Sequence, residues 1–140
     1  MGQRDTHELL KLLSHADWRV RLEAQFELVR QKVNPEYLFQ VASAENKEGY
    51  QQLHATWGLG QLAPQNREAA GYLLELIQAS NPEVRAQAAK LIGDHKLEAG
   101  YADLIAALDD NSDRVKYFAG ISLGKLGNKK AADALLGLFA

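Results

Sequence analysis

The chain has 140 residues, of which 46% are apolar and 24% are charged, an ordinary composition for one globular domain. Its net charge of −2 argues against a nucleic-acid partner, whose phosphates attract strongly basic domains. The absence of cysteine excludes disulfides and thiolate metal sites. No apolar stretch is long enough to enter a membrane, and the polar start Met1–Arg4 lacks a signal peptide, so the chain as written is expected to be cytoplasmic.

The strongest pattern along the chain is a repeat of about 31 residues. Ala24, Ala55, Ala88 and Ala119 are 31, 33 and 31 positions apart, and an aliphatic residue follows each of them four positions later. Such a period is typical of arrays in which each unit buries its apolar face against its neighbours. We therefore expect a single domain over 1–140, built from repeats 5–32, 34–63, 66–95 and 97–127 and a partial repeat 129–140.

Each repeat is predicted to hold a first helix, a short polar turn and a second helix. The first helices are marked by apolar residues at helical spacing, namely Leu9, Leu10, Leu12 and Leu13; Leu38, Val41 and Ala42; Leu73, Leu74, Leu76 and Ile77; Leu104, Ile105 and Leu108; and Leu135, Leu136, Leu138 and Phe139. Asp17, Asn81 and Ser112 are placed to cap the second helices, and Pro82 suits a first helical position. The turn of the second repeat, with Glu45 to Glu48, is expected to be longer or looser.

The ends and faces of the second helices carry further predictions. Gly93, Gly124 and Gly127 lie near helix ends, where glycine can adopt the left-handed cap conformation. A second apolar stripe lies opposite the alanine column, and it predicts second helices that are packed on two sides. The residues of this stripe are Leu22, Phe26 and Val29; Leu53 and Trp57; and Tyr117 and Ile121. Trp57 and Tyr117 are therefore expected in the core.

One column of the second helices is a candidate partner-binding surface: Arg21, Gln52, Arg85 and Lys116. As a groove, it would take an acidic peptide or another carboxylate-bearing partner, gripped by the two arginines. The structural alternative is a ladder in which each basic side chain pairs with turn residues such as Asp17, Asn81 or Asp113. Trp18, near the start of the array, is the aromatic residue most expected to be exposed, and it completes the candidate set.

Catalytic and metal chemistry have little support in the sequence. His7, His15, His54 and His95 are far apart and none forms a helical i, i+3 or i+4 pair. No nucleophile grouping or phosphate loop is found. We therefore expect no enzyme activity, no cofactor and no metal, and a protein or peptide as the partner, with the oligomeric state undefined.

The segments 17–24, 81–88 and 114–127 resemble the HEAT-like repeat, in the short form also seen in phycobilisome-lyase-type proteins. The resemblance covers the whole chain and implies an all-α, right-handed α-solenoid of about four helix pairs plus a terminal helix. For function it implies a protein-interaction or scaffold module, and a lyase-type subunit that positions a bilin is another role seen with such repeats.

A narrower resemblance concerns the runs His15–Phe26 and Leu53–Leu62, which look like the HEAT segment of large exported bacterial proteins. In those, the repeats join a dehydrogenase-like propeller to a cytochrome c domain. This resemblance implies an alternative role, a structural linker of a multidomain membrane-associated or exported oxidoreductase. The apolar run Leu135–Phe139, with no polar capping helix after it, fits a fragment of that kind, which would then be exported or periplasmic.

Overall fold

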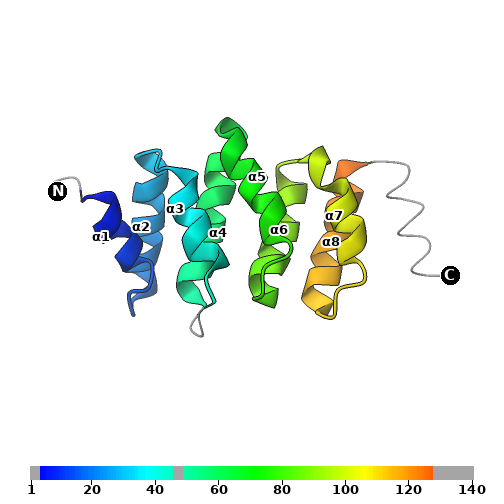
Figure 1. Ribbon diagram of the computed structural model, residues 1–140, viewed down its shortest axis with the longest axis horizontal. Helices are drawn as coiled ribbons and strands as arrows, with labels where there is room; N and C mark the ends of the chain where they lie inside the picture. Colours follow the sequence, from blue (N-terminus) through cyan, green and yellow to red (C-terminus); the bar gives the residue numbers. More distant parts are fainter. Residues whose placement is uncertain (1–3, 46–48, 128–140) are drawn as a thin grey trace. The chain divides into compact units, whose positions relative to one another are not determined.

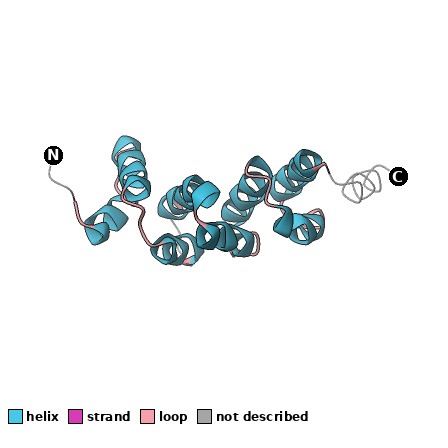
Figure 2. Ribbon diagram, turned by 90° about the horizontal axis from the view of Figure 1, so that it is seen from above, coloured by secondary structure: helices cyan, strands magenta, loops and turns pink. Residues whose placement is uncertain are grey.

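The computed structural model describes residues 4–45 and 49–127, and over these ranges it contains α-helices and two short 3₁₀ helices but no strand (Figures 1 and 2). The elements are α1 (Thr6–Leu12), α2 (Trp18–Arg30), α3 (Pro35–Ser43), α4 (Tyr50–Leu62), η1 (Ala63–Gln65), α5 (Arg67–Leu76), α6 (Pro82–Asp94), η2 (Glu98–Gly100), α7 (Tyr101–Ala107) and α8 (Asp113–Leu126). The all-α prediction is therefore confirmed over the described ranges. The predicted partial repeat 129–140 lies outside them.

The chain divides into two compact units, Met1–Tyr72 and Leu73–Ala140, with α5 crossing the division. In the first unit α1 packs on α2, α3 packs on α4, and the two second helices α2 and α4 pack on each other. In the second unit α7 packs on α8 and α6 packs on α8. Each unit thus stacks its second helices side by side, as a repeat array requires. The single domain and its repeat bounds stay predictions.

The polar turns before the second helices contain the predicted caps. Asp17 Oδ1 accepts from the Arg19 amide at 2.9 Å, Asn81 Oδ1 from the Glu83 amide at 2.9 Å, and Ser112 Oγ from the Val115 amide at 3.4 Å. Pro82 is the first residue of α6, where its missing N–H costs nothing. These three side chains therefore fix where α2, α6 and α8 begin.

The second repeat departs from this pattern, although most of its predicted turn, Glu45 to Glu48, lies outside the described residues. The connection between α3 and α4, residues 44–49, is one residue longer than the connection between α1 and α2, residues 13–17. Gly49 precedes α4 with a φ of 73° and supplies no side-chain cap. A residue with a side chain would be strained there, so the glycine allows the longer turn to enter the helix.

The predicted glycine caps are only partly correct. Gly127 ends α8 with a φ of 65°, but Gly93 and Gly124 lie inside α6 and α8. The left-handed residues after α2 and α6 are instead Lys32 and Lys96, with φ of 54° and 51°. Gly93 serves packing, because a Cβ at this position would lie 2.6 Å from the Ser122 Cα on α8.

The alanine column is the buried seam of the second helices. Ala24, Ala55, Ala88 and Ala119 are all buried, and so are the residues four positions later, Leu28, Leu59, Ile92 and Leu123. In the second unit the seam residues Ile92, Ala119 and Leu123 belong to one apolar cluster with Val115, Leu104 of α7 and Leu108 directly after α7. The burial of all four alanines fits the predicted packed column, and the close approach of helix backbones at these positions stays a prediction.

The prediction that the opposite stripe is packed is wrong. Phe26, Tyr117 and Ile121 are exposed, Tyr117 by 63%, and Trp57 is only partly buried. α2, α4 and α8 each pack on a first helix and a second helix of their own unit. The buried residues of α2 are Arg21, Ala24, Gln25 and Leu28, and those of α8 are Val115, Ala119, Ser122 and Leu123, so burial on these helices follows the seam and not the opposite stripe. Phe26, Tyr117 and Ile121 of the stripe therefore lie at the surface, whereas Leu22, Val29, Leu53 and Trp57 are partly buried.

Candidate interaction surface

An open hollow of about 360 Å³ lies over α2 and α4 in the first unit. Its lining residues are Trp18, Arg21 and Leu22 of α2 and Tyr50, Leu53, His54 and Trp57 of α4. Trp18 and Tyr50 are the first residues of their helices and are 61% and 57% exposed. We call this group of seven residues the aromatic hollow. Two tryptophans and a tyrosine surround its concave, largely apolar surface.

Arg21 supplies the charge of the aromatic hollow and is only 9% exposed. Its Nη1 donates to the carbonyl oxygens of His15, at 2.8 Å, and Ala16, at 3.1 Å, in the turn before α2. Its guanidinium carbon lies 4.5 Å from the centre of the Tyr50 ring, a cation–π contact across to α4. Among the described residues, no carboxylate forms an ion pair with it.

A chain of polar side chains continues from Arg21 between the two helices. Arg21 Nε donates to His54 Nε2 at 3.3 Å, His54 Nδ1 lies 2.9 Å from Gln25 Oε1, and Gln25 Nε2 donates to Gln61 Oε1 at 2.8 Å. This arrangement requires a neutral His54 that accepts at Nε2 and donates at Nδ1. Burial, and secondarily the positive charge of Arg21, lower the pKa of His54 below its ordinary value of 6.5, which keeps the ring neutral.

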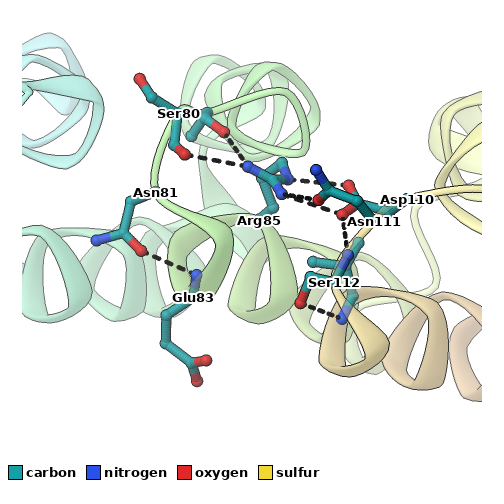
Figure 3. A network of polar contacts seen from close by, with 9 residues as sticks. Ser80, Asn81, Glu83, Arg85, Asp110, Asn111 and Ser112 are labelled. Carbon is teal, nitrogen blue, oxygen red and sulfur yellow. Dashed lines mark hydrogen bonds and ion pairs between the residues drawn. The ribbon is translucent and has the colours of Figure 1, made fainter.

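Arg85 occupies the same column position in the second unit, and its hydrogen bonds are shown in Figure 3. Its Nη1 donates to the carbonyl oxygens of Ala79, at 2.9 Å, and Ser80, at 3.1 Å, as Arg21 does in its own turn. Its Nε and Nη2 hold the two carboxylate oxygens of Asp110 at 2.9 and 3.0 Å, and both side chains are about 15% exposed or less. Arg85 therefore links the turn before α6 to the turn before α8 by hydrogen bonds.

The hydrogen bond from Arg85 also lowers the pKa of Asp110 below its ordinary 3.8, a shift that burial opposes. Asp110 Oδ1 in turn accepts from the Ser112 amide at 2.8 Å, so one carboxylate fixes the guanidinium and the start of α8 together. This is the ladder contact that the structural alternative describes, although the partner is Asp110 and not the Asp113 that the sequence suggested.

The other predicted site residues occupy different environments. Gln52 is buried, and its side-chain amide donates to the Ala44 carbonyl oxygen. The side chain of Lys116 is half exposed, and its Nζ lies 4.0 Å from Asp113 Oδ1. The side chains of the column thus differ in their environments, because some are buried and hydrogen-bonded and Lys116 is exposed. Trp18 is exposed as expected and belongs to the aromatic hollow. The binding roles of these residues stay predictions.

Sequence reasoning missed Tyr50 and assigned Trp57 to the core. A signal was present, because Tyr50 precedes the column alanine Ala55 on α4 much as Trp18 precedes Ala24 on α2. Over residues 4–45 and 49–127, no three His, Cys, Asp or Glu side chains come together as metal ligands, and no helix has the length and apolar character needed to cross a membrane.

Comparisons with known proteins agree with the helix pairs. The family model of HEAT repeats matches residues 35–117 and 72–140. The crystal structure of an engineered protein is similar with a TM-score of 0.55 and 18% identity, over 96% of this chain and 68% of the other. Identity this low shows the fold alone, and together these findings confirm the α-solenoid class. No curated protein matches the chain.

Proposed function

The chain belongs to the HEAT-repeat family, and from this premise we propose that it is a non-catalytic protein-interaction module whose aromatic hollow receives a protein or peptide partner. The observation that carries the proposal is the exposure of Trp18 and Tyr50 beside a hollow of about 360 Å³. Tryptophan and tyrosine are the residues most enriched among the dominant contacts of protein interfaces. A hollow of this size accommodates one or two side chains of a partner.

The polar groups of the hollow support binding in preference to catalysis. Arg21 and His54 are hydrogen-bonded to each other and to the backbone and side chains of α2 and its preceding turn. A general base must reach a substrate proton, but His54 uses both ring nitrogens within the protein. These two residues therefore hold α2 against α4 and give the hollow a fixed shape.

A peptide-display selection against the whole chain tests the proposal. Each selected peptide is then measured by fluorescence polarisation with the parent, with Trp18→Ala and with Tyr117→Ala. Both substitutions remove an aromatic side chain that is more than 60% exposed on a second helix, but only Trp18 lines the hollow.

We expect Trp18→Ala to weaken binding by about tenfold or more, as removal of a dominant interface contact does, and Tyr117→Ala to leave it unchanged. Circular dichroism confirms that both variants stay folded. Failure to select any peptide, or peptides that bind the Trp18→Ala variant as well as the parent, would exclude the aromatic hollow as the interaction surface.

The linker hypothesis, in which the chain is a structural segment of a membrane-associated or exported oxidoreductase, rests on the resemblance of His15–Phe26 and Leu53–Leu62. The described residues add no feature that favours it over the interaction module. The sequence that surrounds this segment in its natural gene would test it directly, because propeller and cytochrome domains must then flank the repeats.

A further inference from the structure

The aromatic hollow carries one positive charge, on Arg21, for which residues 4–45 and 49–127 supply no carboxylate partner. Arg21 and Arg85 donate to equivalent pairs of turn carbonyl oxygens, but only Arg85 holds a carboxylate. Within the described part of the chain, the Nη2 of Arg21 donates to no acceptor, and its Nε donates to the imidazole of His54. Arg21 therefore keeps one of the two donors, Nη2, that Arg85 uses for its carboxylate, while the other, Nε, donates to His54.

We propose that the hollow binds a peptide segment in which a bulky apolar side chain stands next to a carboxylate, and that Arg21 selects the carboxylate. The inference rests on the proposed function and adds to it the chemistry of the partner. Leu22, Leu53 and Trp57 supply the apolar surface for the bulky side chain, and the guanidinium at the edge of that surface supplies the charge.

The contacts of Arg21 favour an anionic over a cationic partner. An aromatic hollow can also bind an ammonium group, but here the guanidinium of Arg21 already lies over the Tyr50 ring. A second cation would lie beside the first, and repulsion between like charges would disfavour it. A carboxylate meets an oriented guanidinium, and hydrogen bonds between such charged groups are among the strongest in proteins.

The same contacts prepare Arg21 for this role. Its hydrogen bonds to His15 and Ala16 and its position over Tyr50 hold the guanidinium in one orientation before any partner arrives. Because it is already ordered and largely desolvated, binding a carboxylate costs little further side-chain entropy. Arg85, with both carboxylate oxygens of Asp110 in place, has no comparable capacity.

The test uses three blocked hexapeptides that share one frame and differ at one position: acetyl-Gly-Ser-Phe-Glu-Ser-Gly-amide and its Gln and Lys versions. The chain has two tryptophans, Trp18 and Trp57, and both line the hollow. Their indole N–H signals in a nitrogen-15 correlation spectrum therefore report binding at this site directly. Titration of the whole chain with each peptide gives three dissociation constants.

We expect the Glu peptide to shift both indole signals and to bind about tenfold more tightly than the Gln peptide, with the Lys peptide weakest. Higher salt should reduce the advantage of the Glu peptide. Equal affinities of the Glu and Gln peptides, or tightest binding of the Lys peptide, would overturn the role of Arg21 and leave the proposed function intact. If none of the three peptides shifts the indole signals, the hollow itself fails as a binding surface.

Arg21→Gln and Arg85→Gln form the matched pair of variants. Arg21→Gln should make the Glu and Gln peptides equal, whereas Arg85→Gln should lower stability and preserve the preference for Glu. A preference for Glu that survives in Arg21→Gln would overturn the assignment. Should Arg21→Gln fail to fold, the peptide comparison with the parent still decides the question, because it changes nothing in the protein.

Discussion

Gly93 on α6 offers the sharpest test of how the second helices pack. A Cβ added there would lie 2.2 Å from Ser122 Oγ, 2.5 Å from Ser122 Cβ and 2.6 Å from Ser122 Cα on α8. Rotation of the Ser122 side chain cannot relieve the last of these contacts, because Cα belongs to the backbone. Gly93→Ala must therefore push α6 and α8 apart.

The size of the effect follows from three contributions. Restoring carbon–carbon contacts to about 3.5 Å requires a helix displacement of about 1 Å, and overpacking of this kind costs about 1–3 kcal/mol. The displacement also strains the hydrogen bond from Ser122 Oγ to the Ala89 carbonyl oxygen, 2.6 Å long, which is worth about 1 kcal/mol. Alanine is the better helix former by about 1 kcal/mol. The net expectation is a loss of about 1–3 kcal/mol of unfolding free energy.

Urea unfolding followed by circular dichroism measures this loss, with Gly124→Ala as the control. Gly124 also lies inside a second helix, but a Cβ there would meet nothing within 4 Å. Gly124→Ala should therefore raise the urea midpoint slightly, while Gly93→Ala should lower it by about 1 M. A Gly93→Ala variant as stable as the parent, or equal losses in both variants, would show that the close approach of α6 and α8 is wrong.

Three further predictions concern polar contacts. Asp110→Asn should cost about 1–3 kcal/mol in urea unfolding, because it weakens the charged hydrogen bonds to Arg85. Since the folded state lowers the pKa of His54, the unfolded state binds more protons below about pH 6.5, so the urea midpoint should fall on acidification to about pH 5.5, and less so in His54→Gln. Glu83→Gln should leave the midpoint unchanged, because its ion pair with Arg114 is solvent-exposed.

The elements that depend on local chemistry were predictable from the sequence. The alanine column follows from a fixed period and the helical spacing of its apolar neighbours, and the structure buries all of it. Asp17, Asn81 and Ser112 cap helices because a short side-chain oxygen can satisfy a free amide two or three residues ahead. The caps need only the residues at the start of their own helix, and the column needs only the period that successive repeats share.

Features that depend on a second helix were not predictable in the same way. Gly93 looks like a glycine near a helix end, and only the position of Ser122 shows that it permits a close approach. The stripe of Phe26, Tyr117 and Ile121 has the spacing of a packed face, but the first helices and the neighbouring second helices contact other sides. Apolar periodicity identifies a face and does not say whether anything covers it.

The basic column shows why this difference matters for function. Arg21 and Arg85 are indistinguishable by position and make the same pair of bonds to turn carbonyl oxygens. Their roles diverge because Asp110 lies opposite one guanidinium and His54 opposite the other. The Asp110 carboxylate neutralises the charge of Arg85 and holds the two turns together. The neutral imidazole of His54 orients the Arg21 guanidinium but does not neutralise its charge. Asp110 belongs to the turn before α8 and His54 to the body of α4, so the two arginines differ through contacts with two non-equivalent positions of the neighbouring repeat.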